Sequence, residues 1–217
     1  MSLALDFRLR HVAPIIIGLV AVMTCIELAL VGADLGLWGG TRWRQGAYDW
    51  GGFWPGLLQG WQPNYTAQPQ AMFLTYAFLH GGFGHLAMNM VTLVSLGQGV
   101  IDRVGGLRFG ILYFGCALGG AGGYGLLAQS AQPMVGASGA LFGLAGALLA
   151  WAYVDRFTAR EALWPIAQIA GFLLAMNVVM FWALNGQLAW QTHLGGFLVG
   201  WVLALLIDPR GRVEDTD

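Results

Sequence analysis

Long apolar stretches, separated by short polar segments, make up most of this 217-residue sequence. Apolar and polar residues do not alternate within the stretches, and most approach the roughly 20 residues that a helix needs to cross a membrane. The pattern therefore predicts an all-α polytopic membrane protein, because a helix satisfies its own backbone hydrogen bonds in lipid. Six spans are expected at about residues 12–31, 72–100, 107–127, 138–153, 162–184 and 192–207.

A single membrane domain is expected over residues 12–207, with a short head (1–11) and a polar tail (208–217). The composition agrees, because 57% of the residues are hydrophobic and only 10% are charged, against roughly 25% charged in soluble domains. The basic head before an apolar stretch also fits a signal peptide, but the stretch is long for one, so we predict a retained span. The net charge of −1 argues against a nucleic-acid partner.

The ten basic residues are all arginines, and their placement predicts the orientation of the chain. Two lie in the loop of residues 34–70, and the other eight lie in the head, the tail and the turns after spans two and four. Because basic residues favour the cytoplasmic side, both termini are expected in the cytoplasm. The 34–70 loop is then outside, and its many tryptophans and tyrosines predict short helices at the membrane surface.

The segment Gly136-Ala137-Ser138-Gly139 opens span four and is the first candidate for chemistry. Its glycines allow a sharp turn, and the start of a helix leaves backbone N–H groups that could bind an oxyanion. Serine alone is a weak nucleophile and needs a base, for which His193 is the candidate. Taken by itself, the segment is more often a helix-packing motif.

Polar residues of three spans are expected at one depth, in the outer half of the membrane. His80, His85, Ser138 and His193 fall in the first parts of spans two, four and six, which all run from outside to inside. Such residues usually line a cavity or contact one another. Asn89 shares a helical face with His85, four residues away. The spacing of His80 and His85 makes a poor metal site, and we expect no metal and no cofactor.

Small residues predict that spans four and six touch. Gly196 and Gly200 follow the histidine of span six on its own face, and Gly139 begins a matching stripe on span four. This contact would bring the histidine to the serine, where Phe142 could stack on the imidazole or serve only in packing. No acid is placed to complete a triad, so we expect a Ser/His dyad. Glu27, the one acid within a span, is interpreted as structural.

Together these motifs resemble the rhomboid family of intramembrane serine proteases, in its basic six-span form. The resemblance covers nearly the whole chain from the first span to the last, and implies a rhomboid-like bundle. It rests on His80-x4-His85-x3-Asn89 in span two, Gly136-Ala137-Ser138-Gly139 opening span four, and His193-Leu194-Gly195-Gly196-x3-Gly200 in span six.

The resemblance also implies a role for each residue. Ser138 would be the nucleophile and His193 the general base, while His85, Asn89 and the serine backbone N–H would form the oxyanion hole. His80 would support the site structurally. Further supporting positions would be Gly136, Gly139, Phe142, Gly196 and Gly200.

The substrates implied by the resemblance are transmembrane proteins, cleaved in or near their membrane-spanning segments within the lipid bilayer. The family admits substrates between spans two and five. The candidates for that gate are Phe83, Phe172, Met176 and Met180. The arginine bias and the compact core favour a bacterial inner membrane, with the site facing outward.

The chain departs from the family at one motif, a Trp-Arg pair that usually precedes the first histidine of span two. Ala71 and Met72 stand there, and the only Trp-Arg is Trp43-Arg44, far upstream. Two other functions remain open: a non-catalytic rhomboid-like protein that binds membrane proteins, and a small-solute channel or carrier. A carrier would be expected to show inverted repeats, and the sequence has none that we can identify.

Overall fold

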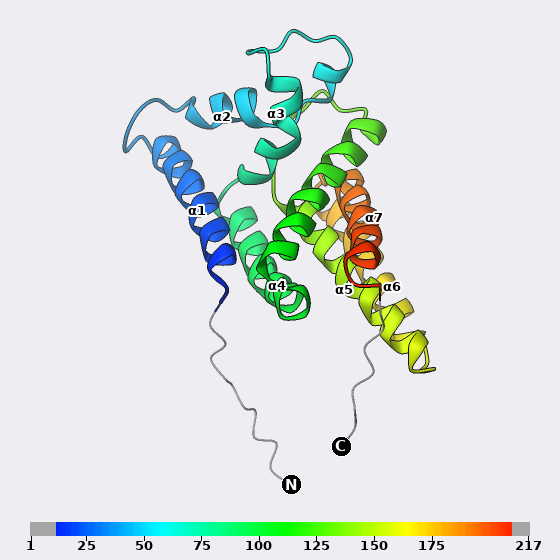
Figure 1. Cartoon of the computed structure of the whole chain (residues 1–217). Helices are drawn as coiled ribbons and strands as arrows, with labels where there is room; N and C mark the ends of the chain where they lie inside the picture. Colours follow the sequence, from blue (N-terminus) through cyan, green and yellow to red (C-terminus); the bar gives the residue numbers. More distant parts are fainter. Residues whose placement is uncertain (1–11, 210–217) are drawn as a thin grey trace.

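The computed structural model describes residues 12–209, and every regular element in that range is helical (Figure 1). The all-α polytopic fold expected from the sequence is therefore confirmed. The elements are α1 (Pro14–Asp34), α2 (Trp43–Gly51), η1 (Pro55–Leu58), α3 (Gln68–Thr75), η2 (Tyr76–Phe78), α4 (Phe83–Leu127), α5 (Ser138–Thr158), α6 (Trp164–Ala183) and α7 (Trp190–Ile207).

Helix α4 is two spans joined by a bend. Its 45 residues would extend about 68 Å as one straight helix, more than twice the thickness of a bilayer core. At Gly105 the backbone leaves the helical region, with φ 80° and ψ 167°, a conformation that glycine adopts without strain. The two limbs, residues 83–104 and 106–127, therefore form a hairpin (Figure 1). Among the described residues, α4 is one of five helices that are long and apolar enough to cross a membrane, together with α1, α5, α6 and α7.

The prediction that span two is one helix from about residue 72 is wrong. Helix α3 ends at Thr75, η2 ends at Phe78, and α4 begins only at Phe83. The pair Gly81-Gly82 interrupts the helix, because glycine is a poor helix former and Gly82 has a positive φ of 109°. His80 consequently lies in a non-helical segment before the span, and not on the same helix as His85.

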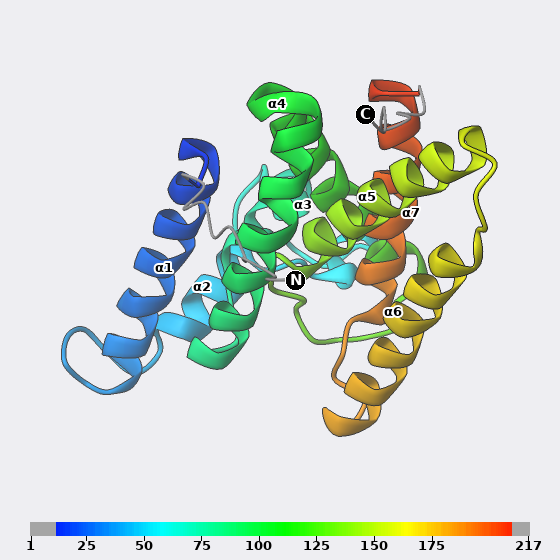
Figure 2. The same ribbon diagram turned by 90° about the horizontal axis from the view of Figure 1, so that it is seen from below.

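Helices α4, α5 and α7 form the centre of the bundle, with α1 and α6 at opposite edges (Figure 2). The α5–α7 contact is made by backbone against backbone. A Cβ atom added to Gly196 would overlap the carbonyl oxygen of Gly139, and one added to Gly200 would overlap that of Gly143. Such close approach, available only without side chains, is how helices associate in lipid. Helix α6 is peripheral, with Ile166 its only buried residue.

The 34–70 loop lies across one end of the bundle and is held there by a charged cluster (Figure 1). The Glu27 carboxylate of α1 is fully buried and pairs with Arg44 of α2 at 2.8 Å. Arg44 also pairs with Asp34 at 2.6 Å and donates a hydrogen bond to the carbonyl oxygen of His80 at 3.0 Å. Arg44 of the upstream Trp-Arg pair thus reaches the segment before span two through space. The structural role predicted for Glu27 is this ion pair.

The ion pairs also keep Arg44 charged. Partial burial lowers its pKa, but the hydrogen bonds that it donates to Glu27, Tyr48 and Asp34 outweigh that effect and raise the pKa above its ordinary value. The guanidinium therefore stays protonated at any physiological pH.

We predict that Gly196→Ala destabilises the bundle, because the new methyl group must push α7 away from α5. Overpacking of this kind costs about 2 kcal/mol. The matched control is Gly171→Ala on α6, where an added Cβ has no neighbour within 4 Å. That control should leave stability unchanged or raise it by up to about 1 kcal/mol, since alanine is the better helix former. Thermal unfolding in detergent measures both, and equal midpoints would contradict the close contact.

We predict that Arg44→Ala lowers the free energy of unfolding by about 3 kcal/mol, because it leaves the Glu27 carboxylate buried without its cation. Arg42→Ala is the control, since Arg42 is an exposed residue of the same loop. Denaturant titration in detergent compares the two. A similar small effect for both variants would show that the cluster does not anchor the loop.

Candidate active site

Ser138 is the first residue of α5, directly after a sharp turn. Gly136 makes the turn with a φ of 126°, a backbone conformation that is costly for residues with a side chain. The Gly136 N–H donates to the carbonyl oxygen of Tyr76 at 3.0 Å, which ties the turn to η2. Because Ser138 begins the helix, the N–H groups of the first turn have no carbonyl one turn earlier to bond. They are available to an anion beside the hydroxyl.

The structure brings Ser138 and His193 together across α5 and α7. The serine Oγ lies 2.9 Å from Nε2 of the imidazole. His193 is buried, with 7% of its surface exposed, and its ring stacks on Phe142 with the ring centroids 4.1 Å apart and the planes 10° apart. The glycine contacts below the site set the helix separation that makes this reach possible.

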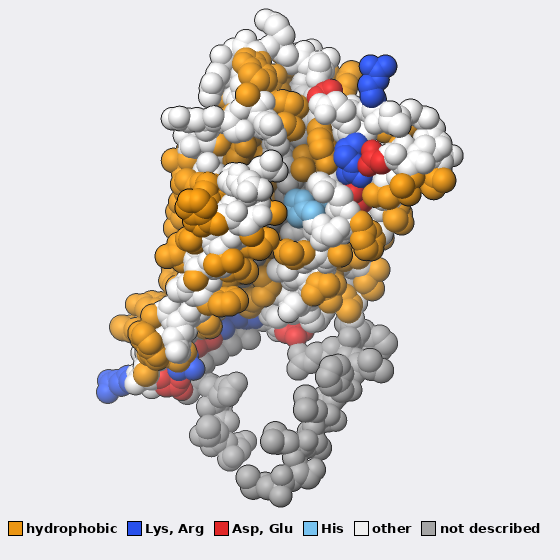
Figure 3. All heavy atoms as spheres, turned by 180° about the vertical axis from the view of Figure 1, so that it is seen from behind, with side chains coloured by type: hydrophobic (Ala, Val, Ile, Leu, Met, Phe, Trp, Pro, Cys, Tyr) orange, Lys and Arg blue, Asp and Glu red, His pale blue; other side chains and the backbone are white. Residues whose placement is uncertain are grey.

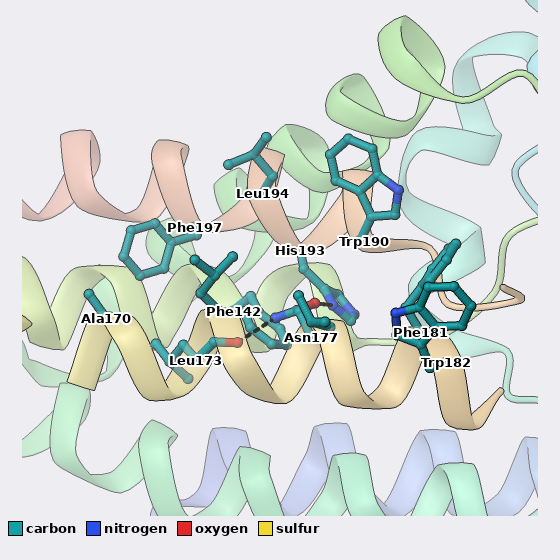
Figure 4. Close-up of a pocket in the computed structure, with 12 residues that line it drawn as sticks. Phe142, Ala170, Leu173, Asn177, Phe181, Trp182, Trp190, His193, Leu194 and Phe197 are labelled. Carbon is teal, nitrogen blue, oxygen red and sulfur yellow. Dashed lines mark hydrogen bonds between the residues drawn. The ribbon is translucent and has the colours of Figure 1, made fainter. Parts of the chain in front are cut away.

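The second imidazole nitrogen meets a residue that the sequence analysis did not identify. Nδ1 of His193 lies 2.6 Å from Oδ1 of Asn177 on α6, and Nδ2 of Asn177 donates to the Leu173 carbonyl oxygen at 2.9 Å (Figure 4). An asparagine within the apolar stretch of residues 162–184 was the available signal, since polar residues at membrane depth usually have a partner.

His85 and Asn89, in the first turns of α4, lie beside the turn that precedes Ser138. A Cβ on Gly136 would lie 2.9 Å from Nε2 of His85 and 3.8 Å from Nδ2 of Asn89. The Gly81 N–H donates to Nδ1 of His85 at 3.2 Å, so Nε2 carries the proton of the neutral ring. Nδ2 of Asn89 is buried without a hydrogen-bond partner in the structure. Two N–H donors therefore lie beside this turn.

His80 is fully buried and packs edge-on against His85, with the ring centroids 5.2 Å apart. His85 itself is partly exposed. Figure 3 shows histidine atoms in a recess of the surface, among hydrophobic side chains and next to Arg and acidic side chains.

The gate candidates lie on the two helices expected for them. Phe83 is the first residue of α4, whereas Phe172, Met176 and Met180 lie on α6. Phe83 and Phe172 expose 62% and 66% of their surface. Both phenylalanines are thus available to lipid or to another helix.

An apolar cavity of about 510 Å³ lies between α5, α6 and α7, with His193 and Asn177 in its wall (Figure 4). Its other lining residues are mainly aliphatic and aromatic. Within residues 12–209, no group of three or more His, Cys, Asp or Glu side chains could hold a metal ion.

Comparison with known proteins gives one consistent result. The family model described as "Rhomboid domain" matches residues 68–210. Similar proteins include RHOMBOID-like protein 5 of Arabidopsis thaliana, 34% identical over 146 residues (61% of this chain, 43% of the relative). RHOMBOID-like protein 6, mitochondrial, of the same plant is 30% identical over 160 residues (71% and 50%). Rhomboid protease GluP of Bacillus subtilis is 34% identical over 131 residues (60% and 25%). The matched part thus spans half or less of each relative.

Proposed function

The chain belongs to the rhomboid family, and on this premise we propose that it is an intramembrane serine endopeptidase. It would hydrolyse peptide bonds in or near the membrane-spanning segments of membrane proteins, with Ser138 and His193 as a catalytic dyad. The observation that carries the proposal is the 2.9 Å hydrogen bond between the serine hydroxyl and the imidazole. Nothing in a merely packed glycine-rich bundle requires that pair.

In the proposed reaction, the Ser138 hydroxyl attacks the substrate carbonyl carbon and gives its proton to Nε2 of His193. The C–O bond forms as the carbonyl electrons move to the oxygen. His193 then protonates the leaving amine, and the peptide bond breaks to leave an acyl-enzyme. Water, deprotonated by the same imidazole, hydrolyses that ester.

The oxyanion would be held by donors from two helices. The backbone N–H groups of the first turn of α5 are one source, and Nε2–H of His85 and Nδ2–H of Asn89 are the other. The buried, unpartnered amide of Asn89 supports this assignment, because a buried N–H normally has an acceptor and an oxyanion would supply one. His80 would hold the His85 ring, and Phe142 the plane of His193.

We propose that the site faces the non-cytoplasmic side, since the arginine distribution places the 34–70 loop there. The protein is an integral multi-pass membrane protein. The relatives do not support a bacterial inner membrane in particular, since they come from plant, fungal, parasite and bacterial species and one is named mitochondrial.

We predict that Ser138→Ala and His193→Ala each reduce substrate cleavage by about 10⁴-fold or more, as expected when a nucleophile or its base is removed. Covalent labelling by a fluorophosphonate should be lost in Ser138→Ala. Ser95→Ala, an exposed serine of α4, should label normally. Wild-type turnover in His193→Ala would refute the dyad. If the wild type neither labels nor cleaves a panel of transmembrane substrates, a non-catalytic binder becomes the better reading.

We predict that Asn89→Ala lowers kcat by about 10² to 10³-fold with little change in KM, because an oxyanion donor acts mainly in the transition state. The control is Met88→Ala, a neighbouring residue that is 60% exposed on the outer face of α4. Steady-state cleavage in detergent separates the two constants. A rise in KM at constant kcat would assign Asn89 to substrate binding instead.

A further inference from the structure

The imidazole of His193, on α7, is held by residues from two neighbouring helices. Ser138 and Phe142 belong to α5, His193 itself to α7, and Asn177 to α6. The asparagine contact is the shorter of the two ring hydrogen bonds, at 2.6 Å against 2.9 Å. It reaches Nδ1, whereas the serine hydroxyl lies next to Nε2.

The hydrogen bonds around Asn177 allow only one arrangement of protons in the neutral site. The Leu173 carbonyl oxygen can only accept, so the amide group 2.9 Å from it must be the NH2 of Asn177. The other amide atom is then Oδ1, which also can only accept. Nδ1 of His193 must therefore carry the ring proton, and Nε2 is left as the acceptor for the Ser138 hydroxyl.

We propose that Asn177 is a positioning residue that orients the base of the Ser138–His193 dyad, an inference that rests on the proposed protease function. Its Oδ1 holds the imidazole in the tautomer whose lone pair faces the serine. When Nε2 takes the serine proton, the ring becomes an imidazolium, and the Nδ1–H bond to Oδ1 becomes charge-assisted and stronger. The proton on Nδ1 stays in place, so the amide never exchanges a proton.

The surroundings of this bond favour such a role. His193 is 7% exposed and lies in the wall of an apolar cavity, where few competing water hydrogen bonds reach the ring. An unpaired Nδ1–H would be costly there. Serine, histidine and asparagine come from three different helices, so folding of the bundle assembles the set.

The test compares Asn177→Ala and Asn177→Asp with the control Val179→Ala, two residues along α6 and 64% exposed. Fluorophosphonate labelling reports the chemistry of the dyad, and cleavage of a transmembrane substrate gives kcat and KM. Nitrogen-15 NMR of histidine-labelled protein reports the tautomer. The chain has four histidines, and the His193 signals are those lost in His193→Ala.

In Asn177→Ala we expect the labelling rate and kcat to fall by about 10- to 100-fold, the range for a hydrogen bond to a charged group. KM should change less than twofold. The His193 spectrum should lose its single Nδ1–H form. Asn177→Asp keeps an acceptor oxygen at the same position and should recover most of the rate and the Nδ1–H tautomer. Val179→Ala should match the wild type in all three measurements.

An unchanged His193 tautomer in Asn177→Ala would overturn the inference even if the dyad is correct. The inference would also be overturned if Asn177→Ala and Asn177→Asp were equally slow and both kept the wild-type tautomer. Failure of the proposed function looks different, because Ser138→Ala would then label as the wild type does. The tautomer measurement needs no activity and separates these two failures.

Discussion

The close contact of α5 and α7 is the constraint on which the site depends. Lipid offers no hydrophobic drive between helices, so association relies on backbones that approach closely enough for dispersion to act. Gly139 and Gly143 meet Gly196 and Gly200 without intervening side chains. At that separation a serine at the start of one helix and a histidine on the next lie within hydrogen-bond distance. A single added methyl group at Gly196 or Gly200 would overlap the backbone of α5 and so would change the distance between the two helices.

Charged clusters hold the bundle at both ends of this seam. On the side of the site, Glu27 and Arg44 join α1 to the external loop and to the segment before α4. On the opposite side, Arg103 of α4 pairs with Asp155 of α5 at 2.5 Å and with Asp208, just after α7, at 3.1 Å. Its guanidinium also lies over the Trp151 ring, 5.0 Å from the centroid, a favourable cation–π geometry. Helix α6 takes part in neither cluster.

The sequence predicted the helical bundle, the contact of spans four and six and the meeting of serine and histidine, because membrane depth and glycine spacing both constrain them. It did not predict where α4 begins, since the apolar pattern continues across the Gly81-Gly82 break. Asn177 was missed for a different reason. Apart from Gln168 and Asn177, span five is apolar on every side, so its sequence does not indicate which face meets α7. The Glu27–Arg44 ion pair could not be predicted either, because it depends on the path of a long loop, and hydrophobic periodicity does not determine that path.

Because α6 is peripheral, the Asn177 hydrogen bond makes the orientation of the His193 imidazole depend on the position of this helix. This helix buries a single residue, yet it supplies the acceptor that orients the imidazole. An outward tilt of α6 would lengthen that bond and leave the ring held only by Ser138 and Phe142 of α5. The His193 imidazole would therefore be fully oriented only while α6 lies against α7. In the proposed protease, the base would then regain its orientation for cleavage only after α6 has returned to its place against α7.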